Sequence, residues 1–146
     1  MNKTTYEEFL EQNGQLTYTF KGTSMMPLLR SGKDLFVVEK NKGSRFKKGD
    51  VVLYRRPPDQ YVLHRIIKVR PEDYVILGDN CINREYGIKD QDILGVMTAY
   101  IRGGKEHSVN ELPYRIYTKT RMSLAPLRIF CKKLRSKAAR LIKGRK

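Results

Sequence analysis

The sequence predicts a mainly β fold: a small coiled or half-open β-barrel of short strands, with a short N-terminal helix and a basic amphipathic C-terminal helix. Six segments rich in Val, Ile, Tyr and Thr, each bounded by Gly, Pro, Asp or Asn, predict the strands. Because they fall within about ninety residues, a coiled or half-closed sheet is favoured. At 146 residues the chain has room for one domain with an appendage at one end.

The elements follow one another without internal repeats. A short helix is expected over residues 4–12, which Thr4 or Thr5 can cap and Gly14 ends. Residues 105–119 have mixed polarity and one Pro, and are interpreted as a linker or a closing edge. The strands are expected over residues 16–20, 34–40, 50–56, 61–69, 74–79 and 93–101.

Basic charge gathers at the C-terminal end. Lys and Arg outnumber Asp and Glu by 30 to 15, and eleven of the basic residues lie within residues 119–146, which hold no acid. The preceding residues are nearly balanced, with nineteen basic and fifteen acidic side chains. We therefore divide the chain into a body, residues 1–118, and a basic amphipathic tail, residues 119–146.

Apolar residues recur along the tail at steps of three and four, and basic residues fill the remaining arc. A helix of this kind over residues 126–142 suits an anionic membrane, where the apolar side inserts and the charges meet lipid headgroups. Nucleic acid is not expected as a partner, because it would leave the apolar side unused. The alternative is a helix that packs its apolar side on the body. This apolar stripe consists of Leu127, Phe130, Cys131, Leu134, Ala138 and Leu141.

Several classes of protein are excluded. The two cysteines, Cys81 and Cys131, fit neither a metal-binding spacing nor a dense disulfide framework. No apolar run approaches the length of a transmembrane helix, and charges interrupt the N-terminus where a signal peptide has an apolar core. The expected location is the cytoplasm, with peripheral contact at a membrane surface.

His64 is the first candidate for a chemical role. The alternation of a strand places it between Val62 and Ile66 on one face of the segment 61–69. Burial among aliphatic neighbours favours the neutral imidazole, which is the form a general base needs. The same position also suits a core histidine that only hydrogen-bonds to the backbone.

Ser24 is the second candidate. It lies in FKGTSMMPLLRSGKD, residues 20–34, which is too broken for a helix and too apolar for an ordinary loop. Together with the segments KKGDVVLYRR, YVLHRIIKV and YVILGDN that follow it, this stretch resembles the signal peptidase I and LexA-like serine peptidase superfamily. The resemblance covers residues 17–102, and Ser-Met-Met-Pro is its most specific element. With His64 at the position of the base, the chain is similar to the histidine branch, that of the endoplasmic-reticulum and archaeal signal peptidases.

The resemblance implies a serine endopeptidase in which Ser24 is the nucleophile and His64 the general base. A serine hydroxyl needs a base within hydrogen-bond reach, and the base benefits from an acid that fixes its tautomer. Asp79 in the Gly-Asp-Asn turn and Glu85 are the candidates for this acid, and a dyad without it is the third option. Asp79 is equally suited to a structural turn. The chemistry uses no metal and no cofactor.

The surroundings of the nucleophile depart from the family in one place. Related signal peptidases often carry a serine two positions before the nucleophile, whose hydroxyl contributes to the oxyanion hole, and here that residue is Gly22. The hole is then expected to rest on the backbone N–H of Ser24, with help from Thr23. Three residues are expected to shape the surface beside the nucleophile where a substrate lies: Met25, Met26 and Pro27.

The expected function is the cleavage of an extended peptide, a leader or a signal-like segment, laid along a strand edge. A catalytically weak or inactive peptide-binding module of the same fold is one alternative, motivated by Gly22, by Arg84 and by the lack of a transmembrane anchor. A self-cleaving regulator is another. It is disfavoured, because the first sixteen residues are too few for a helix-turn-helix domain.

Overall fold

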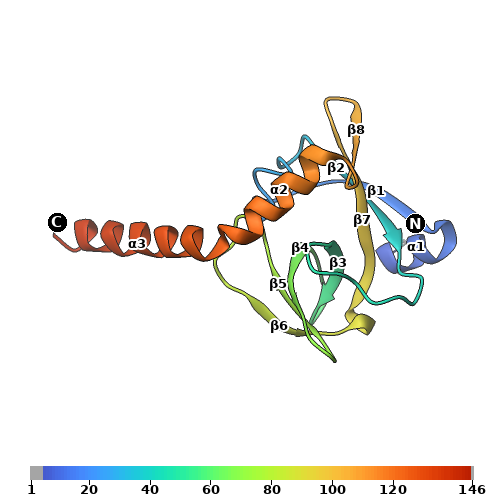
Figure 1. Ribbon diagram of the computed structural model, residues 1–146, viewed down its shortest axis with the longest axis horizontal. Coiled ribbons are helices and arrows are strands. Elements are labelled where there is room, and N and C mark those ends of the chain that lie inside the picture. Colours follow the sequence, from blue (N-terminus) through green and yellow to red (C-terminus); the bar gives the residue numbers. More distant parts are fainter. Residues whose placement is uncertain (1–4, 146) are drawn as a thin grey trace.

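Within residues 5–145, which the computed structural model describes, one antiparallel sheet and three α-helices make up the fold (Figure 1). The helices are α1 (Tyr6–Asn13), α2 (Leu112–Ser123) and α3 (Ala125–Lys143), with one turn of 3₁₀ helix, η1 (Asp90–Asp92). The strands are β1 (Gln15–Thr19), β2 (Leu35–Lys40), β3 (Val51–Arg56), β4 (Gln60–Val69), β5 (Tyr74–Leu77), β6 (Glu85–Ile88), β7 (Ile93–Arg102) and β8 (Lys105–Ser108).

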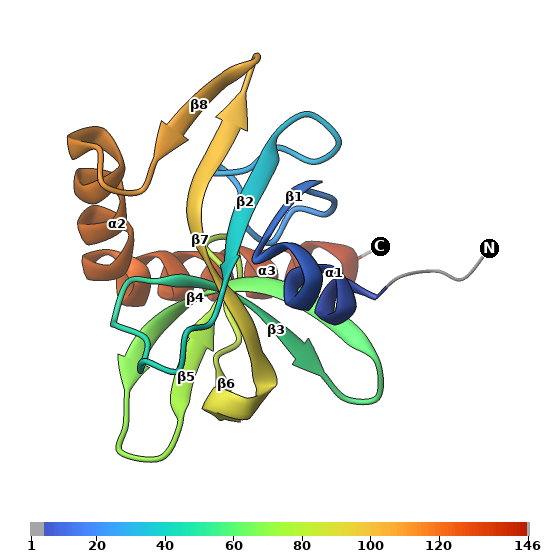
Figure 2. The same ribbon diagram turned by 90° about the vertical axis from the view of Figure 1, so that its right-hand side faces the viewer.

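The sheet is open. Its strands follow the order β1-β2-β7-β3-β4-β5-β6, and β8 pairs with the end of β7. β7 belongs to both halves, because it pairs with β2 along residues 95–101 and with β3 along residues 93–96. Figure 2 shows the two halves splaying apart on either side of this strand. The mainly β fold predicted from the sequence is confirmed, and the sheet does not close into a barrel.

The predicted elements are present, and the structure adds β6, η1, β8 and α2. All six predicted strands form, but β6 and β8 were not predicted, since EYGI and KEHS lack the apolar alternation of a strand. The linker or closing edge expected over residues 105–119 is β8 followed by part of α2. The predicted boundary between body and tail, after residue 118, therefore lies inside α2.

The N-terminal helix begins at a capping box. Oγ1 of Thr5 accepts a hydrogen bond from the backbone N–H of Glu8 at 3.1 Å, and the Glu8 carboxylate accepts from the Thr5 N–H at 3.0 Å. Gly14 ends the helix at φ 74°, a left-handed conformation that glycine adopts at little cost. Thr4, the other predicted cap, lies outside the described residues.

Side chains are buried on both faces of the β3–β4 hairpin. Val51 pairs with Arg65 and Val52 with His64, and successive residues point to opposite faces. Burial on both sides gives β4 four consecutive buried residues, 63–66. The larger core includes Leu10, Leu16, Phe20, Met25, Leu29, Phe36, Val38, Leu53, Leu63 and Met97. The smaller core consists of Phe46, Val52, Tyr54, Ile66, Tyr74, Ile76 and Ile93.

A buried ion pair between Arg65 on β4 and Asp79 after β5 joins the sheet to α2. The guanidinium donates to both carboxylate oxygens, at 2.7 and 2.8 Å, and the two side chains are 1% and 2% exposed. Arg65 also donates to the carbonyl of Gly49 and to Thr118 of α2, while the Tyr117 hydroxyl donates to Asp79 at 2.8 Å. Burial alone would lower the pKa of Arg65, but Asp79 holds it above its usual value. The charges are thus buried with their hydrogen-bonding partners.

α3 continues from α2 after one residue, Leu124. Its first turns dock on the body, where Ala125 and Ile129 pack against Leu77 of β5. Beyond this contact the helix extends away from the sheet (Figure 1). Within the described part of the chain, no helix combines the length and the apolar character needed to cross a membrane.

We predict that Asp79→Ala lowers the free energy of unfolding by about 3–5 kcal/mol, because it leaves the Arg65 guanidinium buried without its carboxylate. Urea unfolding at neutral pH measures the loss. Asp73→Ala is the control, since its partner Arg70 is partly exposed and this pair stabilises the fold far less. Equal losses in the two variants would contradict the structural role given to the buried pair.

Candidate active site

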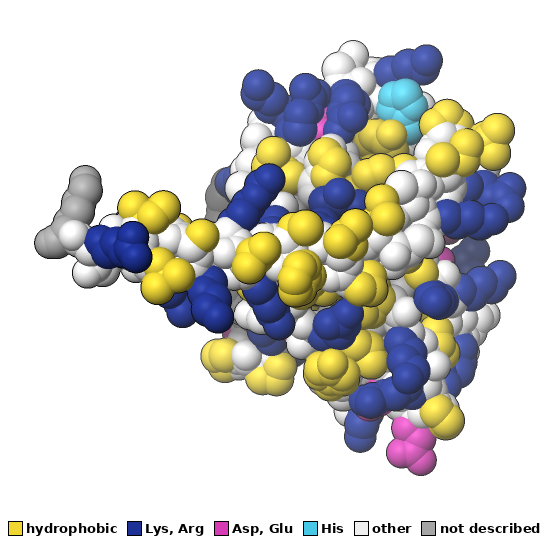
Figure 3. All heavy atoms as spheres, turned by 60° about the vertical axis from the view of Figure 1, so that its left-hand side comes forward, with side chains coloured by type: hydrophobic (Ala, Val, Ile, Leu, Met, Phe, Trp, Pro, Cys, Tyr) yellow, Lys and Arg dark blue, Asp and Glu magenta, His cyan; other side chains and the backbone are white. Residues whose placement is uncertain are grey.

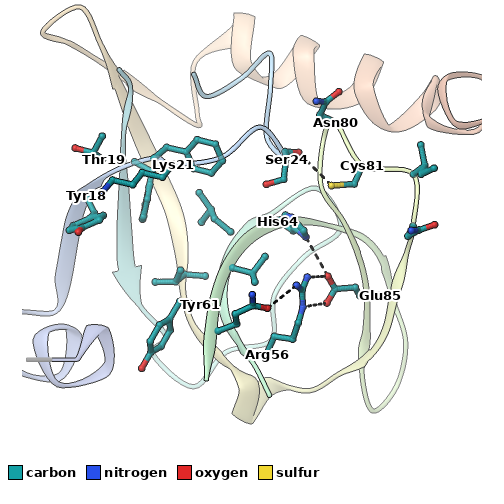
Figure 4. Close-up of a pocket in the computed structure, with 18 of the residues that line it drawn as sticks. Tyr18, Thr19, Lys21, Ser24, Arg56, Tyr61, His64, Asn80, Cys81 and Glu85 are labelled. Carbon is teal, nitrogen blue, oxygen red and sulfur yellow. Dashed lines mark hydrogen bonds and ion pairs between the residues drawn. The ribbon is translucent and has the colours of Figure 1, made fainter. Parts of the chain in front are cut away.

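An open cleft of about 1210 Å³ lies between β1 and the first half of β4 (Figure 4). Within the described residues β1 pairs only with β2, and residues 60–64 of β4 pair only with β3, so both strands keep a free edge. Tyr6 of α1 bridges the two sides, with its ring centroid 5.4 Å from that of Tyr18 and 4.9 Å from that of Tyr61. The cleft is larger than the roughly 300–1,000 Å³ typical of small-molecule sites, and its size suits several residues of a peptide.

The loop that carries Ser24, residues 20–34, is anchored at its C-terminal end by Asp34. This carboxylate is fully buried and binds the guanidinium groups of Arg30 and Arg102, at 2.9 and 3.0 Å. Burial alone would raise the pKa of Asp34, but the two guanidinium groups hold it well below its usual range. These charge-assisted hydrogen bonds fix the C-terminal end of the loop in place.

The turn after β5 holds the backbone of the predicted nucleophile. The Asn80 N–H donates to the carbonyl of Ser24 at 2.8 Å, and the Asn80 side-chain amide donates to the carbonyl of Thr23 at 3.0 Å. From α3, the ammonium group of Lys132 donates to the Asn80 side chain at 2.6 Å. Three separate parts of the chain thus meet beside Ser24.

His64 lies on β4 with 6% of its surface exposed. Nδ1 of its ring is 3.2 Å from the Tyr54 hydroxyl and 3.7 Å from the Glu85 carboxylate. Burial lowers the pKa of His64 to about 4, although the charge of Glu85 acts in the opposite direction. The ring is therefore neutral at pH 7, in agreement with the desolvation predicted from its strand neighbours.

Gly78 lets the backbone of Ser24 approach the ring of His64. A Cβ atom at this position would stand 2.5 Å from Sγ of Cys81, 2.8 Å from the Ser24 carbonyl oxygen and 3.0 Å from Nε2 of His64, too close for any other residue without displacement. Figure 4 shows Ser24 and His64 next to each other on one wall of the cleft. Within residues 5–145 no hydrogen bond joins the Ser24 hydroxyl to the ring. Catalytic hydrogen bonds of this kind often tighten only when substrate is bound.

The two candidate acids occupy different environments. The Asp79 carboxylate binds Arg65 and Tyr117, and makes no hydrogen bond to His64 within the described residues. The Glu85 carboxylate lies on the Nδ1 side of His64 and pairs with Arg56 (Figure 4). Of the two, Glu85 is the one within ion-pair distance of the imidazole.

The backbone around Ser24 leaves donors for an oxyanion. Within the described residues, the N–H groups of Thr23 and Ser24 donate no hydrogen bond, whereas the Gly22 N–H donates to Ser31 at 2.9 Å. Gly22 has φ 101°, a conformation that residues with a Cβ rarely adopt. The backbone therefore favours glycine where related signal peptidases carry serine.

Of the residues expected to shape the surface beside Ser24, one is buried in the core and the others are exposed to solvent. Met25 is fully buried in the larger core, and its sulfur accepts a hydrogen bond from the Asp79 N–H at 3.4 Å. Thr23, Met26 and Pro27 are exposed, but none of the three lines the cleft. The structure thus brings Ser24, His64 and Glu85 together in the cleft and leaves the four flanking residues outside it.

Several residues beside His64 or in the cleft were not predicted. Tyr54 contacts His64 because the β3–β4 hairpin pairs Arg56 with Gln60, and this register brings Tyr54 and His64 together on neighbouring strands. The short Pro-Pro-Asp turn could have indicated this register. Cys81 lies beside Ser24, and burial raises the pKa of its thiol. No local signal in the sequence places residues of the tail in the cleft, where the structure puts Lys132, Arg135 and Ser136.

No protein-family model matches the chain, and no curated protein matches it either. The resemblance to signal peptidases therefore rests on the motif residues named above. Within residues 5–145, no three His, Cys, Asp or Glu side chains gather in a way that could hold a metal ion. The chemistry of the cleft is argued below from Ser24, His64 and their neighbours alone.

We predict that His64 makes the stability of the fold depend on pH. Its pKa is about 4 in the folded chain and 6.5 in the ordinary imidazole, so between these values the unfolded chain binds more protons. The free energy of unfolding therefore falls as pH drops from 6.5 to 4, by about 3 kcal/mol in total from this residue.

The measurement is urea unfolding of the protein and of His64→Asn at about pH 7 and about pH 4.5, since the variant lacks the titrating ring. The loss of stability on acidification is expected to be smaller in the variant. The same loss in both proteins would show that His64 is not the desolvated group described.

Proposed function

We propose that the protein is a serine endopeptidase that cleaves an extended peptide with Ser24 as nucleophile and His64 as general base. The observation that carries the proposal is that the Ser24 backbone and Nε2 of a buried, neutral imidazole both lie against Gly78, while Ser24 and His64 line the same open cleft. A base must be neutral to accept a proton, and it must lie near the hydroxyl it activates.

In the proposed reaction Nε2 accepts the proton of the Ser24 hydroxyl as Oγ bonds to the scissile carbonyl carbon. His64 then donates this proton to the leaving amine as the C–N bond breaks. A water molecule hydrolyses the acyl-enzyme by the same route. For Nε2 to accept, Nδ1 must carry the hydrogen, and it can donate to the Tyr54 hydroxyl, with the Glu85 carboxylate 3.7 Å away.

The free strand edges suggest how the peptide lies. An extended segment that enters the cleft can hydrogen-bond to the edge of β1, to the edge of β4 along residues 60–64, or to both. Backbone pairing of this kind fixes the register of the scissile bond and depends little on sequence. A leader or signal-like peptide, unfolded over the cleavage region, is the class of substrate that this geometry accepts.

The oxyanion hole makes the proposed enzyme a slow one. The N–H groups of Ser24 and Thr23 are available, but Gly22 supplies no hydroxyl. Loss of one donor typically costs on the order of 3 kcal/mol of transition-state stabilisation. A catalytically weak peptide-binding module is the second candidate, favoured by this missing hydroxyl and by the unmade Ser24–His64 hydrogen bond.

A fluorophosphonate probe separates the two candidates, because it bonds covalently to an activated serine. We expect labelling at Ser24, located by mass spectrometry of the digested protein, and loss of labelling in Ser24→Ala and His64→Ala. Ser136→Ala is the matched control, since Ser136 also lines the cleft. Absence of labelling in a folded protein would favour the binding module.

We predict that Gly78→Ala reduces cleavage of a peptide substrate about 100-fold, because the added methyl group displaces the Cys81 thiol and the Ser24 backbone, which both lie beside the His64 ring. Steady-state kinetics measure kcat/KM, and circular dichroism checks that the variant is folded. Gly144→Ala is the control, since Gly144 at the end of α3 has a negative φ of −73°. Unchanged kcat/KM in Gly78→Ala would contradict the proposed arrangement.

A further inference from the structure

The apolar stripe of α3 is exposed along its whole length. Its large side chains are more than half exposed, and they include Leu127 at 59%, Phe130 at 63%, Leu134 at 56% and Leu141 at 64%. The residues that dock the helix on the body are instead Ala125 and Ile129. The alternative in which the stripe packs on the body is therefore wrong. An exposed apolar surface of this extent marks an interaction site.

The stripe and the cleft lie on opposite sides of the same helix. Each residue advances an α-helix by about 100°, so Leu134 and Ser136 point about 200° apart. Lys132 and Ser136, which both line the cleft, point away from the stripe, and Arg135, which also lines it, points about 100° from Leu134. The stripe accordingly faces away from the proposed active site.

Positive charge flanks the stripe on both sides. Figure 3 shows apolar side chains in a row along the helix, with Lys and Arg on either side of the row. α3 contains no acidic residue. Its seven basic residues are Arg128, Lys132, Lys133, Arg135, Lys137, Arg140 and Lys143.

We propose that α3 docks the protein on the surface of an anionic lipid bilayer, with the apolar stripe inserted between headgroups and the flanking Lys and Arg side chains against the lipid phosphates. This occupant uses both chemical features of the helix. A second copy of the chain would bury the stripe but would bring two helices of seven like charges together. A nucleic acid would use the charges and leave the stripe in water.

Docking in this orientation places the cleft next to the membrane. The helix is about 10 Å across, so the wall formed by Lys132 and Ser136 stands roughly that distance above the lipid surface. Peptides that lie on or leave the bilayer would meet the cleft there. Membrane docking does not depend on Ser24 or His64, and its test is independent of cleavage.

The first experiment is co-sedimentation of the full chain with vesicles. We expect binding to vesicles of phosphatidylcholine and phosphatidylglycerol in a two-to-one ratio, and at least about tenfold weaker binding to phosphatidylcholine alone. Leu134→Ser/Leu141→Ser and Lys133→Gln/Lys137→Gln/Arg140→Gln should each weaken anionic binding about tenfold or more. Lys42→Gln/Lys89→Gln/Lys105→Gln, three exposed lysines outside α2 and α3, is the charge-matched control and should bind as the unaltered protein does.

The second experiment uses the absence of tryptophan from the sequence. In Phe130→Trp the indole replaces a stripe residue, and we expect its fluorescence to shift to shorter wavelength with anionic vesicles and to be quenched by brominated lipid. Phe9→Trp is the control, since α1 lies at the opposite end of the molecule from α3 (Figure 1). Its emission should not respond to vesicles.

Three results would overturn the proposal. One is vesicle binding that is unchanged in Leu134→Ser/Leu141→Ser, which would show that the protein binds lipid only through nonspecific charge attraction. Another is a dimer in light scattering that Leu134→Ser/Leu141→Ser dissociates, in a protein that does not bind vesicles. The last is tight binding of a single-stranded oligonucleotide, unaffected by the stripe variant, without vesicle binding. Circular dichroism of each variant excludes unfolding as the cause.

Discussion

The buried ion pair between Arg65 and Asp79 is the constraint on which the arrangement of the site depends. It fixes β4 against the turn after β5, and the residues next to its two members are His64 and the pair Gly78 and Asn80. Whatever holds Arg65 and Asp79 together therefore also holds the imidazole against the backbone of the serine loop. The pair also binds hydroxyl groups of α2, so the helix that leads into the tail is set by the same contact. In this chain Asp79 holds the site in place through its pairing with Arg65, and Glu85 is the carboxylate beside the imidazole.

Burial of the imidazole has two opposite effects on the proposed chemistry. Withdrawing His64 from water lowers its pKa to about 4, so the imidazole stays neutral and available as a base over a wide range of pH. A base with so low a pKa is also a weak one, and its drive to remove a serine proton is correspondingly small. Glu85 offsets part of this cost, because its charge stabilises the imidazolium that forms during proton transfer. Together with the glycine at position 22, this balance fits the slow peptidase proposed above.

Much of the fold could be predicted from the sequence, because its main strands are long and apolar enough to be recognised by composition and turns. β8 could not, since KEHS is a polar, partly exposed hairpin strand that within the described residues pairs only with β7. α2 was missed because Tyr, Ile and Thr in LPYRIYTKTRMS favour strands locally, while burial of Tyr114 against the sheet favours the helix. In the site, Ser24 and His64 could be named from motif and alternation. The partner of Asp79 could have been anticipated too: an arginine at the centre of a buried strand requires an acid, and Arg65 is one.

α3 takes part in the site as well as in the proposed surface contact. Its side chains form part of the cleft wall, and two of its cations bind the carbonyl groups of Asn80 and Cys81, next to the nucleophile loop. A shortened chain that ends after α2, made to improve solubility or crystallisation, would thus lose one wall of the groove and two supports of the turn behind Ser24. Such a protein would lack part of the proposed site, and activity measured on it would not describe the chain that contains α3.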